Sequence, residues 1–202
     1  MPDRTHIALL VDRSGSMMKI RDDAQGGIAA LLAEQKAQPG KATVSLHQFD
    51  NEYEHVYGPV AITDAPAYEL HPRGMTALLD ALGYTIGDTA GWIASLPEGE
   101  RPDLVIVAVA TDGQENASRE SDRPTIRKAI DDRTAAGWQF AFLSADFDAV
   151  GEARDLGFAA DASVGYMATA AGTRNAYSSL SASVSRSRST GARLTVDRPD
   201  AG

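Results

Sequence analysis

Five oxygen-bearing side chains in this sequence have the types and the spacing to hold a cation. Asp12, Ser14 and Ser16 alternate in DRSGSM, directly after the apolar run HIALLV. Thr76 follows a glycine in RGMTALLDAL, and Asp112 ends the apolar run LVIVAVAT. No His or Cys is among them, so the set offers only hard oxygen ligands. Such ligands suit Mg²⁺, Mn²⁺ or Ca²⁺ better than zinc or copper.

Asp12 and Asp112 each stand where a run of apolar residues ends. If both runs are parallel strands of one sheet, the two carboxylates lie at its carboxyl edge, where doubly wound folds bind ligands. They repel each other there unless a cation lies between them. Magnesium takes about six oxygens and keeps several waters, so this set leaves a coordination position for an outside ligand.

The D-x-S-x-S stretch lacks the marks of several familiar phosphate-binding and nucleophile motifs. A P-loop needs a glycine-rich turn ending in Gly-Lys-Ser/Thr, and neither that turn nor a dinucleotide fingerprint is present here. Asp12 and Ser16 occupy positions where a nucleophile elbow has glycine. Ser14 replaces the second acid of phosphatases that use a strand-end aspartate nucleophile. Helix capping by Ser14, Ser16 or Thr76 stays open at this point.

Apolar periodicity predicts the elements that position these residues. Continuous apolar runs, typical of parallel strands buried on both faces, cover 7–11, 104–110 and 140–143. Alternating runs at 43–49 and 53–57 predict a hairpin with one antiparallel edge strand. Helical spacing covers 17–32 and 75–93, and further helices begin at Asp122 and near 148. We predict an α/β fold: a doubly wound, mostly parallel central sheet with helices on both faces.

The chain divides into one domain and a C-terminal region of different composition. Residues 1–165 contain no internal repeat and no linker. From Ser178 the chain is rich in serine and arginine, but Tyr177, Leu180 and Val184 have helical spacing. We expect a C-terminal helix over 166–188, packed on the domain, and a flexible tail over 189–202.

Composition excludes several classes of function. The chain has 202 residues, a formal net charge of −9 and no cysteine. Phosphates would be repelled by most of an acidic surface, so we expect no nucleic-acid partner. The longest apolar runs are too short to span a bilayer, and no secretory leader is evident, so we expect no membrane partner and a cytoplasmic location.

At DRSGSM (12–17), GMT (74–76) and VATDG (109–113) the sequence resembles the von Willebrand factor type A (VWA) family. The resemblance covers roughly residues 5–165 and is to free-standing bacterial or phage members. It implies a complete metal-ion-dependent adhesion site (MIDAS), in which Ser14, Ser16 and Thr76 bind the ion through their hydroxyls. Asp12 and Asp112 would act mostly through bound waters or as second-layer acceptors.

Three functional hypotheses follow. The leading one is a binding module that is not an enzyme, in which a partner protein supplies an Asp or Glu carboxylate to Mg²⁺, Mn²⁺ or Ca²⁺. The second is a metal-dependent hydrolase of phosphoesters, which needs a general base. Two acids near the motifs in sequence could serve as that base. We expect Glu115 to be a solvated loop residue and Asp80 to occupy an ordinary surface position. The third is a structural scaffold whose metal site has no function.

Two remaining features carry expectations of their own. His6, His47, His55 and His71 show no short ligand spacing, so we predict no histidine metal site. Gly26-Gly27 lies inside the first helix, where each glycine costs about 1 kcal/mol, and a close approach of that helix to the sheet would account for the pair.

Overall fold

The computed structural model describes residues 2–197, which form one six-stranded sheet of order β3-β2-β1-β4-β5-β6. The strands are β1 Arg4–Asp12, β2 Lys41–Phe49, β3 Tyr53–Ala61, β4 Leu104–Thr111, β5 Gln139–Ser144 and β6 Ser163–Gly165. β1 pairs in parallel with both β2 and β4, and β4, β5 and β6 continue the parallel sheet. β3 pairs antiparallel with β2 at the edge. The predicted doubly wound, mostly parallel sheet with one antiparallel edge strand is confirmed.

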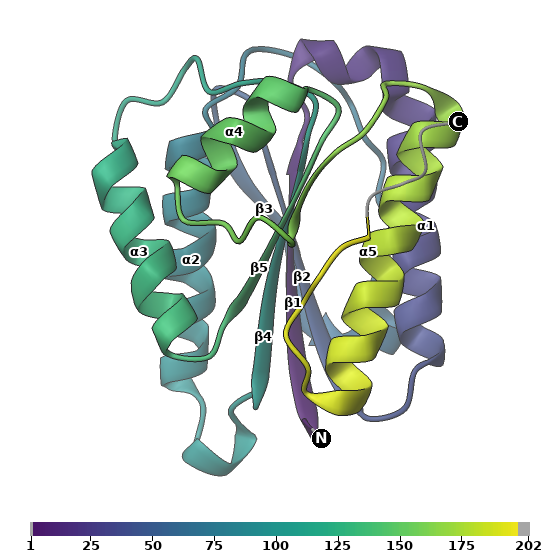
Figure 1. Cartoon of the computed structure of the whole chain (residues 1–202). Helices are drawn as coiled ribbons and strands as arrows, with labels where there is room; N and C mark the ends of the chain where they lie inside the picture. Colours follow the sequence, from purple (N-terminus) through teal and green to yellow (C-terminus); the bar gives the residue numbers. More distant parts are fainter. Residues whose placement is uncertain (1, 198–202) are drawn as a thin grey trace.

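Helices cover both faces of the sheet, with α1 and α5 on one side and α2, α3 and α4 on the other (Figure 1). The α-helices are α1 Arg21–Ala37, α2 Leu78–Ser95, α3 Arg123–Ala135, α4 Phe147–Asp155 and α5 Ala170–Thr190. Three short 3₁₀ helices are η1 Gly15–Ile20, η2 Ile62–Asp64 and η3 Glu98–Glu100. Within residues 2–197 no helix combines the length and the apolar character needed to cross a membrane.

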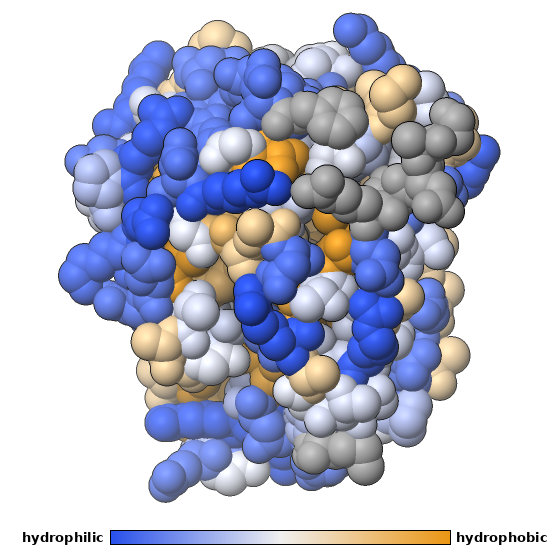
Figure 2. All heavy atoms as spheres, in the orientation of Figure 1, coloured by the Kyte–Doolittle hydropathy of each residue, from blue (hydrophilic) through white to orange (hydrophobic). Residues whose placement is uncertain are grey.

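Strand alternation builds two separate hydrophobic cores. In β1, Ile7, Leu9 and Val11 pack toward α1 and α5, whereas Ala8 and Leu10 pack toward α2. β4 alternates in the same way, because successive side chains of a strand point to opposite faces. The central strands are therefore buried on both sides, while hydrophilic side chains cover most of the face shown in Figure 2.

Three local features differ from the sequence prediction. The periodic stretch from Met17 begins as the 3₁₀ helix η1 and becomes α-helical only at Arg21. α2 begins at Leu78 and not at Met75, because the backbone before it bonds to other loops. The prediction omits β6, since a three-residue strand, Ser163–Gly165, shows no apolar pattern.

The expectation of a flexible tail from residue 189 is wrong for the described part. α5 continues to Thr190 and ends at Gly191, whose φ of 73° favours glycine. Beyond it Leu194 and Val196 are buried in the core beneath α5. The Leu194 amide donates to Gln139 Oε1 (2.8 Å), which ties the segment to β5. Residues 198–202, the rest of the expected tail, lie outside the described residues.

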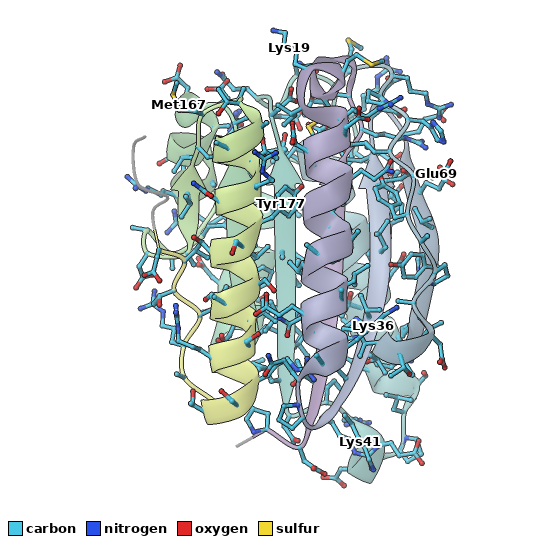
Figure 3. All side chains as sticks on the ribbon, turned by 90° about the vertical axis from the view of Figure 1, so that its right-hand side faces the viewer. Lys19, Lys36, Lys41, Glu69, Met167 and Tyr177 are labelled. Atoms are coloured by element: carbon cyan, nitrogen blue, oxygen red, sulfur yellow. The ribbon has the colours of Figure 1, made fainter. Side chains whose placement is uncertain are left out.

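The two glycines of α1 have different surroundings. A methyl group at position 27 would lie 2.5 Å from Cγ of Tyr177, whereas one at position 26 would meet no atom within 4 Å. Figure 3 shows Tyr177 between α1 and α5, which lie side by side. The close approach of α1 is thus to α5, and the expectation of a close approach to the sheet is wrong.

We predict that Gly27→Ala destabilises the protein by about 1–3 kcal/mol, because the buried Tyr177 ring must move. Gly26→Ala is the matched control, and it should raise stability by about 0.5–1 kcal/mol through helix propensity alone. Urea unfolding of both variants checks this. Equal effects of the two substitutions would show that α5 does not seat on Gly27.

Candidate metal site

The structure brings the five predicted residues together at the carboxyl end of the sheet. Asp12 ends β1 and Asp112 directly follows β4, the two adjacent strands at which the strand order reverses. Asp12 is fully buried. Its Oδ1 accepts from the Ser14 amide (2.6 Å) and its Oδ2 from the Thr111 hydroxyl (2.5 Å). Both oxygens already have a donor, so Asp12 orients the loop that follows it.

The serine hydroxyls point at each other and at the second carboxylate. Ser14 precedes η1 but makes no side-chain capping hydrogen bond there. Ser16 Oγ donates to Asp112 Oδ1 (2.6 Å) and lies 3.0 Å from Ser14 Oγ. Because the Ser16 proton goes to Asp112, the contact with Ser14 is donated by Ser14. The two hydroxyl oxygens therefore lie together beside the Asp112 carboxylate.

Thr76 completes the group from the loop before α2. Its amide donates to Asn116 Oδ1 (2.9 Å), and its carbonyl accepts from the Asn116 amide (3.0 Å). A methyl group placed on Gly113 would lie 3.5 Å from Thr76 Oγ1 and 3.7 Å from Ser16 Oγ. The two hydroxyls therefore face the same side of Gly113. The N-cap position of α2 is occupied by Ala77 and not by Thr76, so capping explains neither Ser14 nor Thr76.

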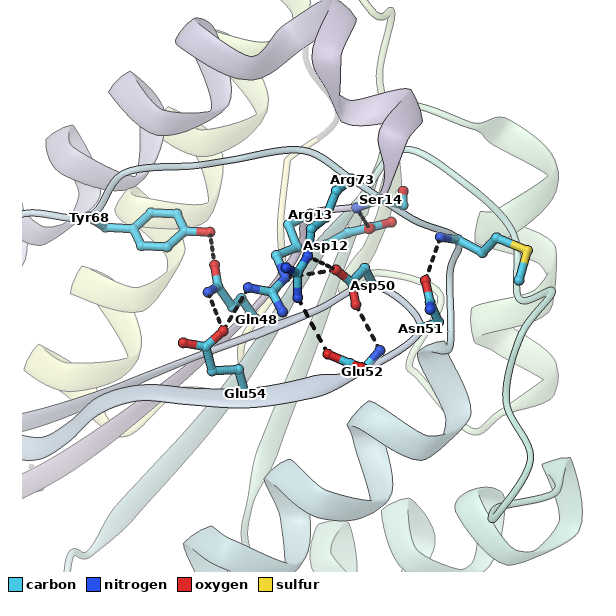
Figure 4. A network of polar contacts seen from close by, with 11 residues as sticks. Asp12, Arg13, Ser14, Gln48, Asp50, Asn51, Glu52, Glu54, Tyr68 and Arg73 are labelled. Carbon is cyan, nitrogen blue, oxygen red and sulfur yellow. Dashed lines mark hydrogen bonds and ion pairs between the residues drawn. The ribbon is translucent and has the colours of Figure 1, made fainter.

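An ion-pair network centred on the buried Asp50 fixes the two hydroxyl-bearing loops to each other (Figure 4). The buried Arg13 guanidinium lies 3.1 Å from Asp50 Oδ2 and 2.7 Å from Glu54 Oε2. Arg73 Nε donates to the same Asp50 oxygen (2.6 Å), and the Arg73 amide to the Arg13 carbonyl (2.6 Å). Burial alone would raise the pKa of Asp50, but hydrogen bonds from Arg73 and the Glu52 amide and the charge of Arg13 hold it below its usual value.

The backbone conformation and the close surroundings of Gly74 explain why the GMT motif begins with glycine. Its φ is 68°, and a methyl group there would lie 2.3 Å from Asn51 Oδ1. Asn51 Oδ1 accepts from the Met75 amide (3.1 Å), and the Gly74 carbonyl accepts from the Gly15 amide (3.1 Å). Any other residue would clash with Asn51 and strain the loop that carries Thr76.

The electrostatics of the two carboxylates fit a bound cation. Burial raises the pKa of Asp12 to about 6, against the opposing hydrogen bonds from Thr111 and Ser14. Burial also raises the pKa of Asp112, against the bond from Ser16 and the charge of Lys19. Negative charge is therefore disfavoured at both groups, and a nearby cation would remove that penalty. Together with the oxygen-only donors, this fits a hard divalent ion.

The two acids considered as general bases are engaged elsewhere. Glu115 is half-buried and accepts from the amides of Leu79 (2.9 Å), Ala117 (2.9 Å) and Ser118 (2.7 Å), so it caps α2 and is not a solvated loop residue. Asp80 accepts from the amides of residues 119, 120 and 121. Asp80 therefore fastens the loop before α3 to α2. Neither carboxylate is free to take a proton from water at the site.

A second cluster, which the sequence does not predict, lies between β2, β3 and α2. The hairpin register places His47 opposite His55, and Asp88 of α2 completes a set whose ligand atoms lie within 4.8 Å of one another. The two imidazoles are stacked at 4.7 Å with an angle of 22°, so their nitrogen lone pairs do not converge. A sequence-based register of the hairpin that pairs Phe49 with Tyr53 would have placed His47 opposite His55.

Hydrogen bonds assign a protonation state to the buried histidines. Tyr53 donates to Asp88 Oδ2 (2.7 Å), so its oxygen can only accept, and His47 Nδ1 (2.7 Å) must carry the proton. His47 Nε2 then accepts from Ser45 Oγ (2.9 Å), which accepts from His6 Nε2 (3.2 Å). Both ring nitrogens of His47 are engaged in this series of hydrogen bonds. A metal could bind His47 only if one of these bonds were broken.

Solved structures of known proteins share this fold at low sequence identity. Proximal thread matrix protein 1 (PTMP1) from the mussel byssus matches with a TM-score of 0.61 and 13% identity over 92% of this chain and 46% of PTMP1. A von Willebrand factor type A protein from Catenulispora acidiphila gives 0.60 and 15% over 90% and 42%. The Plasmodium vivax TRAP protein gives 0.52 and 13% over 70% and 57%.

The sheet order, the helices on both faces and these matches show that the chain has the VWA fold. This chain spans less than half the length of PTMP1 and of the Catenulispora protein. No family model and no curated protein matches the sequence itself. Among the matched structures, one of PTMP1 has a zinc-occupied MIDAS motif, and that of TRAP is manganese-loaded.

The buried histidines predict a pH dependence of stability. Burial lowers the pKa of both His6 and His47 to about 3, against 6.5 for the exposed group. Above pH 6.5 both imidazoles are neutral in the folded and in the unfolded protein. Below it only the unfolded state gains a proton, so the free energy of unfolding falls by roughly 1.4 kcal/mol per pH unit for each histidine.

Urea unfolding of the His47→Gln variant between pH 6.5 and 4.5 should show a shallower dependence than the wild type. His71→Gln is the control, since it removes an exposed histidine outside the buried cluster, and its curve should run parallel to the wild type. Parallel curves for all three proteins would contradict the assignment of a neutral His47.

Proposed function

We propose that this protein is a metal-dependent binding module and not an enzyme. In this proposal Ser14, Ser16 and Thr76 hold a divalent cation through their hydroxyls. Asp12 and Asp112 balance its charge through hydrogen bonds and bound water. When bound, the cation supplies a Lewis-acidic coordination position that a carboxylate of a partner protein completes.

The observation that carries the proposal is that these hydroxyls gather beside Asp112 and take no part in helix capping. Ser14 and Thr76 stand next to helices yet make no capping bonds, and Ser16 Oγ is turned toward Asp112 (2.6 Å). Their backbones are instead held by Asp12, Asn116 and the Arg13 network, so the oxygens do not need to support the fold. Neutral hydroxyls neutralise a cation less than carboxylates do, which leaves it attractive to an outside acid.

The structural matches support the choice of a divalent ion. PTMP1 with zinc and TRAP with manganese both have the fold seen here. For this chain the oxygen-only donors favour Mg²⁺, with Mn²⁺ and Ca²⁺ as alternatives, over zinc. The local cation would allow a protein with a net charge of −9 to bind an acidic residue.

We predict that Mg²⁺ or Mn²⁺ raises the free energy of unfolding of the wild type by about 2.7 kcal/mol at a free concentration of about 100 Kd. Asp112→Asn and Ser14→Ala should each lose most of this increment. Thermal melts with increasing metal, supported by calorimetric titration, measure it. Asp148→Asn is the matched control, since Asp148 is an exposed acid of the same groove but not one of the five residues.

An equal metal response in wild type, Asp112→Asn and Ser14→Ala would refute the assignment of the site. An increment lost equally in Asp148→Asn would show that general acidity of this face, and not the five residues, attracts the ion.

We further predict no metal-dependent turnover on a panel of phosphomonoesters and phosphodiesters, because Glu115 and Asp80 are engaged with backbone amides. A spectrophotometric assay with Mg²⁺ and Mn²⁺ tests this. Turnover that requires metal and disappears in Ser14→Ala would favour the hydrolase hypothesis.

A further inference from the structure

Three methionines expose their side chains, which is unusual for so apolar a residue. Met18, Met75 and Met167 are 58%, 51% and 61% exposed. Among the residues whose burial the structure describes, Tyr84 is the one other exposed large hydrophobic residue, at 42%, and Met17 is fully buried. Exposed apolar side chains that gather at one place mark an interaction surface more often than scattered ones do.

Two of the three adjoin proposed metal ligands directly. Met18 follows Ser16 by two residues within η1, and Met75 immediately precedes Thr76. The loop of Met75 is held against the loop of Ser16 by the bond from the Gly15 amide to the Gly74 carbonyl (3.1 Å). Both methionines therefore belong to the edge of the proposed site.

Met167 comes from a distant part of the chain to the same end of the molecule. It precedes Ala168, which lines a groove of about 490 Å³ together with Ser16 and Asp112. Figure 3 shows Met167 and Lys19 at one end, with Lys36 and Lys41 at the other. Lys19, the neighbour of Met18, lines the same groove as Ala168, the neighbour of Met167, so η1 and the segment before α5 bring these two methionines to the same end of the molecule.

We propose that Met18, Met75 and Met167 form a methionine rim that selects a short partner segment in which one Asp or Glu is flanked by apolar side chains. This inference rests on the proposed function, in which the acid completes the shell of the cation. Methionine suits the role because its unbranched, polarizable side chain adapts to apolar groups of different shapes.

The charged side chains that line the groove further restrict the class of partner segment that can bind. With Asp112 assigned to the cation, Asp146 and Asp148 still outnumber Lys19 along the wall of the groove, so additional acids beside the bound one would meet like charge. Acidic runs are therefore poorer ligands than a single acid between apolar residues. Any carboxylate satisfies the cation, and discrimination among partners then falls to the apolar flanks.

The test uses three synthetic peptides in Mg²⁺, measured by fluorescence anisotropy: Asp flanked by leucines, Asp flanked by serines, and Asn flanked by leucines. The wild type should bind the Leu-flanked Asp peptide about tenfold or more tighter than the Ser-flanked one, and the Asn peptide weakly. Met18→Gln/Met75→Gln/Met167→Gln should lose the preference for leucine. A separate Mg²⁺ titration shows whether the metal site of that variant is intact.

Footprinting of the wild type supplies a second readout that requires no variant. Mild peroxide oxidises exposed methionines, so the Leu-flanked Asp peptide should slow oxidation of Met18, Met75 and Met167, while the buried Met17 stays unoxidised throughout. Mass spectrometry measures each site.

Two outcomes would overturn the rim while leaving the metal site standing: Mg²⁺ binding with equal affinity for both Asp peptides, or oxidation rates unchanged by the peptide. Self-association of the chain in Mg²⁺ that buries the same methionines would also overturn it, by assigning the rim to a second copy. Absence of Mg²⁺ binding in the wild type would instead refute the proposed function.

Discussion

The burial of the Asp12 carboxylate at the end of the central strand is the constraint on which the rest of this structure depends. β1 is covered on both faces and flanked by β2 and β4, so its last side chain is removed from water. The Ser14 amide and the Thr111 hydroxyl each donate to one of its oxygens. The hydrogen bond from the Ser14 amide to Asp12 requires a sharp turn of the chain. This turn directs Ser14 and Ser16 toward the end of β4.

Residues other than Ser14, Ser16 and Thr76 anchor the loops of the site, so the hydroxyls of these three remain available to bind a ligand. Capping of α2 falls to Glu115, the Thr76 backbone is held by Asn116, and Arg13 joins the first loop to the β2–β3 turn through Asp50. Because anchoring is done by these longer side chains and by backbone groups, the short hydroxyls carry little of the folding energy. A site built in this way can be complete before any ligand arrives.

The sequence is informative where a pattern is local and poor where it depends on pairing in space. Apolar runs and strand-end acids are enough to predict the sheet and the meeting of Asp12 with Asp112. The role of Glu115 cannot be read from its neighbours, because the amide it caps lies 36 residues away. The packing of Leu194 and Val196 cannot be read from the sequence either, since these two apolar residues stand in a serine- and arginine-rich segment and yet join the hydrophobic core.

In the function we propose, charge and apolar surface have separable roles at the carboxyl edge of the sheet. A cation attracts every carboxylate with similar strength, so coordination alone gives affinity without choice of partner. Apolar contact has the opposite property, because its free energy depends on how much partner surface is covered. A site with neutral hydroxyls at its centre and flexible apolar side chains at its edge therefore separates the group that attracts a partner from the groups that discriminate among partners.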